Sequence, residues 1–253
     1  AVVFPECAYP TYEVGALTSG ARAVALDEPE AVPADARLIW INSPANPTGR
    51  ILGLGEMRAF VAAARARGAV LASDECYGEF GWDVEPVSVL HPSVNGGDGG
   101  GLLALHSLSK RSNVAGYRAG FVAGDPALVG PLLEVGKHTG MIVPAPVQAA
   151  MVALLEDDAH VGEQRSRYLR RRAVLRPALE AVGFTVVDSE GSLYLWCTRG
   201  EDCRASVDFL AGLGILVAPG DFYGPGGARF VRVALTATDE RVEAAAARLS
   251  AAG

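Results

Sequence analysis

Short apolar runs recur along the first half of the chain and limit its fold more than any other feature. Each run is apolar throughout instead of alternating with polar residues, which is typical of strands covered by helices on both faces. A pattern typical of an Ala-rich helix, residues 53–68, separates the third run from the fourth and ends at Gly68. This alternation predicts an α/β fold with an open, mostly parallel sheet and flanking helices. The six runs span residues 2–4, 21–26, 37–42, 69–74, 102–107 and 119–124.

The second half of the chain has a different texture. A long helical pattern follows Pro144 and continues to about Gly183, and Pro177 predicts a break or bend within it. Strand-like and helical segments then alternate, which predicts a smaller α+β domain. The strands are expected at 184–188, 192–198, 214–220 and 230–235, and the helices at 203–212 and 238–250.

These patterns divide the chain into two domains. We expect a large α/β domain at residues 1–159 and a small C-terminal α+β domain at residues 160–253, with the long helix as the hinge element. The Gly-rich stretch at 94–101 predicts a mobile loop. The sequence leaves open whether that loop covers a binding site.

Composition narrows the range of functions and partners. The formal net charge of −7 disfavours a nucleic-acid partner, because a negative surface repels phosphates. No uninterrupted run of about 18 apolar residues is present, so no membrane span is expected. The four scattered cysteines indicate a reduced, cytoplasmic protein, and the four histidines show no spacing typical of a metal site. The basic segment at 165–176 is expected to be a solvated helix face.

Polar side chains follow successive strands of the predicted sheet. Asn46 comes after the third run, Asp74 and Tyr77 after the fourth, and Ser107 and Lys110 after the fifth, while Arg118 precedes the sixth. Taken singly, each has an ordinary explanation as a turn residue, a helix cap, a core side chain or a surface charge. Because ligands bind at the carboxyl ends of strands in open α/β sheets, the shared position favours one binding site.

One ligand, pyridoxal 5'-phosphate, could use the whole set. A lysine amine forms a Schiff base with an aldehyde, which assigns the catalytic role to Lys110. The pyridine nitrogen needs a carboxylate partner, which Asp74 would supply. The remaining contacts are assigned as Tyr77 and Asn46 to the phenolic oxygen, Arg118 and Ser107 to the phosphate, and Tyr9 to the ring face.

Four segments in this order, YPTY, NPTG, DECY and SLSKRSNVAGYRAG, resemble the class I/II aminotransferases, which are fold-type I pyridoxal-phosphate enzymes. The resemblance extends over nearly the whole chain and implies that fold, a transaminase activity and a homodimer. The stretch GGARFVRVALT resembles the part of the family that binds the substrate α-carboxylate. It implies that Arg232 binds this group together with Asn46, and Arg229 is a weaker candidate.

Some stretches resemble succinyldiaminopimelate transaminases in particular. This implies transfer from N-succinyl-LL-2,6-diaminopimelate to 2-oxoglutarate, in lysine biosynthesis. The resemblance also implies a family segment before Val2 that supplies a strand and a phosphate loop, so we expect the large domain to be incomplete at its N-terminus. The alternatives are a pyridoxal-phosphate lyase or decarboxylase of the same fold, and an inactive fragment or cofactor-sensing domain.

Overall fold

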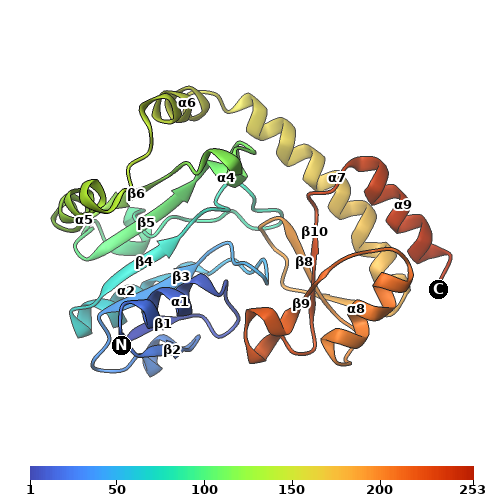
Figure 1. Ribbon diagram of the computed structural model, residues 1–253. Helices are drawn as coiled ribbons and strands as arrows, with labels where there is room; N and C mark the ends of the chain where they lie inside the picture. Colours follow the sequence, from blue (N-terminus) through green and yellow to red (C-terminus); the bar gives the residue numbers. More distant parts are fainter.

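A computed structural model describes residues 1–253 and contains two separate sheets (Figure 1). The larger sheet has six strands in the order β2-β1-β3-β4-β5-β6. Every pairing in it is parallel except that of β5 with β6, which is antiparallel. All six predicted strands are present, and the mostly parallel α/β sheet is confirmed. Their bounds are β1 Val2–Phe4, β2 Ala23–Ala25, β3 Leu38–Asn42, β4 Val70–Asp74, β5 Leu102–Ser107 and β6 Gly120–Gly124.

Helices cover both faces of β3. Ile39 and Ile41 point to the face covered by α2 (Leu54–Arg67), where they join a core of 17 buried residues. Trp40 lies between them in the strand and so points to the other face. There its ring stacks on Tyr12 of α1 (Thr11–Thr18), with centroids 5.1 Å apart. The continuous apolar pattern of this strand therefore reflects packing on both sides.

Helix α2 occupies the predicted segment and ends where the sequence indicated. Gly68 follows it with φ of 59°, in the left-handed region, and its N–H bonds to the Ala64 and Arg65 carbonyls. This cap turns the chain into β4, whose last residue is Asp74.

Two further helices leave much apolar surface exposed. Helices α5 (Pro126–Thr139) and α6 (Ala145–Leu155) bury no residue fully. Leu132, Leu133 and Val135 of α5 are each more than half exposed, as is Val152 of α6. Helix α5 lies beside β6, the edge strand of the large sheet, whereas α6 lies farther from it, just before α7 (Figure 1).

The predicted long helix is two helices, and its break lies elsewhere than expected. The chain is interrupted between α6 and α7 (Ala159–Ala181), where the Asp157 side chain accepts a hydrogen bond from the Ala159 N–H at 2.8 Å. Of the break or bend expected near Pro177, the break is wrong, because Pro177 lies inside α7, and the bend stays a prediction. Pro177 and Ala173, whose carbonyl loses its partner, are both exposed, so water can bind that carbonyl.

The basic segment of α7 is only partly a solvated face. Arg171 pairs with Asp239, and Arg172 with Asp83, and the side chains of these arginines are 12% and 13% exposed. Arg167 and Arg170 are exposed as expected. Half-buried arginines in this segment therefore join α7 to its neighbours.

The smaller sheet is antiparallel and has the order β7-β8-β10-β9. Helix α9 (Asp239–Ser250) packs with α7 against it, around Leu179, Leu195 and Leu249. The strand expected at 214–220 is shorter than predicted, because only Ala218–Pro219 pairs with β10. Helix α8 (Cys203–Gly212) is as expected, and the strands are β7 Thr185–Val187, β8 Tyr194–Thr198, β9 Ala218–Pro219 and β10 Val231–Ala234.

The Gly-rich loop at 94–101 leads into the amino end of β5. Its first two residues belong to the short helix α3 (Pro92–Asn95). The Arg65 side chain binds the Asn95 and Asp98 carbonyls, and Asp125 accepts a hydrogen bond from the Gly101 N–H. The loop therefore lies at the edge of the sheet opposite Ser107. None of the helices combines the length and apolarity that a membrane crossing requires.

We predict that Gly68→Ala lowers the free energy of unfolding by about 1 kcal/mol, because an alanine is strained at a positive φ. Gly15→Ala is the matched control, since Gly15 lies in α1 and a Cβ there meets nothing within 4 Å. This control is expected to stabilise the protein by about 0.5–1 kcal/mol through helix propensity. Thermal or urea unfolding measures both, and equal effects of the two substitutions would contradict the assignment of the cap.

Candidate functional site

The loop after β3 is held by the last residue of that strand, Asn42. The buried Asn42 side chain donates to the Asp74 carbonyl at 2.9 Å and to the Pro44 carbonyl at 3.1 Å. Its oxygen accepts the Asn46 N–H at 2.8 Å. Asn42 and Asp74 are also register partners of the parallel pair β3–β4. Asn46 is thereby fixed beside the carboxyl end of β4.

Asp74 lies at this edge with two donors on its carboxylate. The Tyr12 hydroxyl donates to Oδ2 at 2.6 Å, and the Cys76 N–H donates to Oδ1 at 3.1 Å. Burial and then the Asp74 charge raise the pKa of Tyr12 far above its usual value. Burial also raises the pKa of the Cys76 thiol, whereas the Lys110 charge lowers it, so Lys110 lies near the residues that follow β4.

Lys110 is carried by a single turn of helix directly after β5. This turn, α4 (Leu108–Arg111), begins after Ser107, whose hydroxyl oxygen accepts the Ser109 N–H at 3.1 Å. The same hydroxyl donates to the Ala119 carbonyl at 3.3 Å. In the Ser-x-Ser-Lys segment, Ser107 therefore both ends β5 and caps the following turn. This turn holds Lys110 half-buried.

Arg118 stands between this turn and β6. It adopts φ of 53° and its guanidinium donates only to the Ala115 carbonyl, at 2.9 Å, without a carboxylate partner. Gly120 then pairs with Ser107, and a Cβ at Gly120 would lie 2.8 Å from the His106 carbonyl oxygen. Of the two glycines that flank Arg118, packing requires Gly120, whereas Gly116 faces open space.

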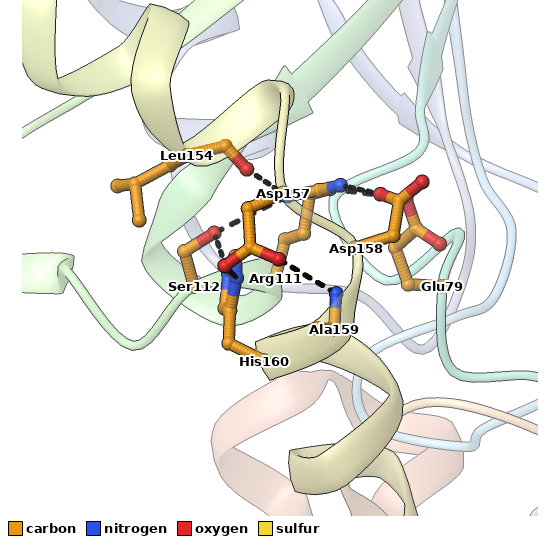
Figure 2. A network of polar contacts seen from close by, with 8 residues as sticks. All are labelled: Glu79, Arg111, Ser112, Leu154, Asp157, Asp158, Ala159 and His160. Carbon is orange, nitrogen blue, oxygen red and sulfur yellow. Dashed lines mark hydrogen bonds and ion pairs between the residues drawn. The ribbon is translucent and has the colours of Figure 1, made fainter.

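A network around Arg111 ties the lysine turn to the junction of α6 and α7 (Figure 2). The Arg111 guanidinium, 10% exposed, donates to the Leu154 carbonyl at 2.7 Å and pairs with Glu79 and Asp158. His160 contacts the Ser112 hydroxyl at 2.9 Å and Asp157 at 3.0 Å. His160 and the Ala159 N–H hold the pKa of Asp157 below its usual value.

The small sheet contributes Arg232, on β10. Its guanidinium donates to the Asn46 side-chain oxygen at 2.7 Å, and its Nε is buried without a partner. The guanidinium carbon lies 3.9 Å from the centroid of the Tyr194 ring and 5.0 Å from that of Tyr223. Arg232 has no carboxylate partner, so a cation held among aromatic rings keeps donors free for an anion.

Two tyrosine hydroxyls also meet between the sheets. Tyr77, three residues after Asp74, lies 3.0 Å from Tyr194 of β8, measured between the hydroxyl oxygens. Burial and then the Tyr194 phenol raise the pKa of Tyr77 well above its usual value. Burial likewise raises the pKa of Tyr223 to about 12, against the opposing charge of Arg232. The Tyr77 and Tyr223 phenols therefore keep their protons near pH 7.

The structure brings most of the expected site residues together. The ends of β3, β4 and β5 place Asn46, Asp74, Tyr77, Ser107 and Lys110 at one edge of the sheet, and β10 adds Arg232. Tyr9 is less engaged: it is 47% exposed, makes no side-chain hydrogen bond, and lies near Tyr223. Arg229 is exposed and bonds to the Gly200 carbonyl, away from Asn46.

Three residues of the site, Tyr12, Asn42 and Tyr194, were not predicted from the sequence. Tyr12 is the second tyrosine of the YPTY segment, and its spacing of one helical turn from Tyr9 was a signal. Asn42 ends a predicted strand, where a polar residue after an apolar run could have been noted. Tyr194 carried no signal, because it lies in an apolar strand and its hydroxyl partner is 117 residues away.

Residues 7–249 match the model of the aminotransferase class I and II family. A probable aminotransferase of Mycobacterium tuberculosis is 62% identical over 250 residues, which cover 98% of this chain and 60% of that protein. A 4-dedimethylamino-4-oxo-anhydrotetracycline transaminase of Streptomyces rimosus is 61% identical over 250 residues, covering 98% of this chain and 70% of that protein. The chain therefore spans only part of the length of these relatives.

Solved structures agree with the fold. An aminotransferase of Neisseria meningitidis superimposes with a TM-score of 0.90 at 30% identity, covering 99% of this chain and 69% of that one. A probable N-succinyldiaminopimelate aminotransferase of Thermus thermophilus gives a TM-score of 0.85 at 29% identity, covering 100% and 71%. With its fold, its lysine turn and the match over nearly its whole length, the chain belongs to the class I and II aminotransferases.

Proposed function

We propose that this chain carries the active site of an aminotransferase that moves an amino group from an amino acid to a 2-oxo acid. The observation that carries the proposal is the meeting of a lysine turn, a carboxylate and an arginine without a carboxylate partner. These groups are Lys110 beside β5, Asp74 at the end of β4, and Arg232 facing Asn46. Nucleophile, acid and anion-binding cation are the groups that amino-group transfer needs.

The family uses pyridoxal 5'-phosphate, and the residues fit that cofactor. The Asp74 carboxylate accepts two hydrogen bonds and keeps lone pairs for a protonated pyridine nitrogen. The Arg118 guanidinium has no carboxylate partner and is available to a phosphate. Tyr77 and Asn46 would bind the phenolic oxygen, and Tyr9 would cover the ring face. Ser107 would turn its hydroxyl proton from the Ala119 carbonyl to the phosphate.

When bound, the cofactor supplies an electron sink for the electrons of the substrate Cα–H bond. Lys110 would hold the cofactor aldehyde covalently, and its amine, once displaced by the substrate, takes the Cα proton. Arg232 binds the substrate α-carboxylate through two parallel N–H donors, while Asn46 holds that guanidinium in place. Fixing the carboxylate fixes the direction of the Cα–H bond, which increases the rate through orientation.

For the substrates, we propose N-succinyl-LL-2,6-diaminopimelate as donor and 2-oxoglutarate as acceptor, within lysine biosynthesis in the cytoplasm. The support is the resemblance of sequence stretches and the name of the Thermus relative. The relative from Streptomyces rimosus, at 61% identity, carries the name of a tetracycline-type transaminase, so an oxo-tetracyclic acceptor belongs in the test. We also propose a homodimer, which the exposed apolar side chains of α5 and α6 support.

The natural protein is incubated with pyridoxal phosphate, 2-oxoglutarate and a panel of amino donors, and glutamate is measured. We expect glutamate to form with N-succinyl-LL-2,6-diaminopimelate faster than with LL-diaminopimelate or aspartate. The reverse reaction, from glutamate to an oxo-anhydrotetracycline, tests the other substrate. A lyase or decarboxylase would consume the donor without forming glutamate, and that result would contradict the proposal.

Lys110→Arg is expected to abolish covalent cofactor attachment and to lower transaminase activity at least about 10³-fold, because it removes the amine nucleophile and the base. The chain has only one other lysine, Lys137, which is exposed on α5 and pairs with Glu134. Lys137→Arg is therefore the matched control. Mass spectrometry after borohydride reduction should show the added cofactor mass on the peptide with Lys110. A labelled Lys137 peptide would refute the assignment.

Arg232→Lys is expected to raise KM for the amino donor by about 10- to 100-fold, because lysine cannot bind a carboxylate with two parallel donors. Arg229→Lys is the control and should leave KM within about twofold, since Arg229 is exposed and bonds to the Gly200 carbonyl. Steady-state kinetics measures both variants. If Arg229→Lys has the larger effect, the two arginines have been assigned in the wrong order.

A further inference from the structure

Tyr194 contacts two residues of the proposed site, Tyr77 and Arg232. It lies in the small sheet, whereas Tyr77 follows a strand of the large sheet. It is 6% exposed and lies on β8, while Tyr77 follows β4 of the large sheet. Its hydroxyl lies 3.0 Å from that of Tyr77, and the two rings meet edge to face at 5.8 Å. Its ring face receives the Arg232 guanidinium at 3.9 Å. Tyr194 therefore contacts both the expected cofactor side and the expected substrate side.

The direction of the hydrogen bond between Tyr77 and Tyr194 can be inferred from the protons that the two hydroxyls can donate. Neither hydroxyl has another hydrogen-bond partner within the protein, and each phenol has one proton to donate. The Arg232 cation over the Tyr194 ring stabilises partial negative charge on that phenol and so strengthens it as a donor. If Tyr194 donates to Tyr77, the Tyr77 proton stays available for an acceptor in the site. The opposite direction would direct the Tyr77 proton away from the site.

We propose that Tyr194 is a positioning residue, which donates to the Tyr77 oxygen and leaves the Tyr77 proton for the phenolic oxygen of the bound cofactor. The inference rests on the proposed function, because it requires pyridoxal phosphate beside Tyr77. A hydrogen bond received by Tyr77 polarises its own O–H group and makes it a stronger donor. The small sheet thereby tunes the cofactor through a residue that touches neither the phosphate nor the pyridine nitrogen.

The absorbance of the bound cofactor reports the donor strength of Tyr77 without an activity measurement. The absorbance of the bound cofactor changes when the nitrogen of its bond to lysine loses a proton. A hydrogen bond from Tyr77 stabilises the negative charge on the neighbouring phenolic oxygen. The nitrogen proton also stabilises this charge, so the nitrogen loses its proton more easily when Tyr77 is a strong donor. A weaker donor at Tyr77 therefore favours the protonated form and raises the pH midpoint of the absorbance change.

The test uses the natural protein loaded with pyridoxal phosphate and the variant Tyr194→Phe, which keeps the ring under Arg232. We expect the midpoint to rise by about half a pH unit, and by more in Tyr77→Phe. The double variant should match Tyr77→Phe, because Tyr194 acts only through Tyr77. Tyr168→Phe is the matched control, since Tyr168 is also buried but its hydroxyl donates to Asn113 and not to Tyr77, and the midpoint of this variant should not move.

The possible failures can be told apart. If Tyr77→Phe shifts the midpoint and Tyr194→Phe does not, Tyr194 only packs, and the inference is overturned while the proposed function stands. Additive shifts in the double variant would also overturn it, because Tyr194 would then act by another route. If no cofactor absorbance develops, or Tyr77→Phe has no effect, the placement of the cofactor is wrong and the inference fails with it.

Discussion

The parallel pairing of β3, β4 and β5 is the constraint on which the proposed site depends. Parallel strands end at the same edge of a sheet, so Asn42 and Asp74 become register partners and Ser107 ends the next strand. The Asn42 side chain then binds both the β4 carbonyl and the loop that carries Asn46. The positions of the proposed cofactor residues thus follow from backbone pairing and one buried amide.

The second sheet completes this edge from a distance in sequence. Asn46 receives Arg232, and Tyr77 receives Tyr194, across separations of 186 and 117 residues. The lysine turn is held independently, through Arg111 and the junction of α6 with α7. The lysine turn is therefore tied to α7, the helix that leads into the small sheet, while Asn46 and Tyr77 are tied to the small sheet itself. A shift of that sheet would change the surroundings of the lysine, the phenol and the expected carboxylate site together.

The charged side chains of the proposed site differ in the hydrogen-bond partners that they have within the protein. Arg118 and Arg232 have no carboxylate partner, whereas the Asp74 carboxylate accepts hydrogen bonds from Tyr12 and Cys76. By contrast, the largely buried Arg111, Arg171 and Arg172 pair with carboxylates. The Nε of Arg232 is buried without a partner, which is unfavourable in isolation, whereas Arg118 is exposed. The unpartnered donors of Arg232 beside Asn46 therefore indicate that an anion binds there.

The sequence by itself determined the six strands of the large sheet, the cap of α2 at Gly68, and the polar residues at the strand ends. These features are local, because they follow from apolar pattern, turn chemistry and spacing. It placed a break or bend at Pro177, whereas the chain is interrupted between α6 and α7, and only the structure shows that Ala173 and Pro177 are exposed. Tertiary structure alone brought Tyr12 to Asp74, Tyr194 to Tyr77 and Arg232 to Asn46, because contacts between distant segments depend on how two sheets pack.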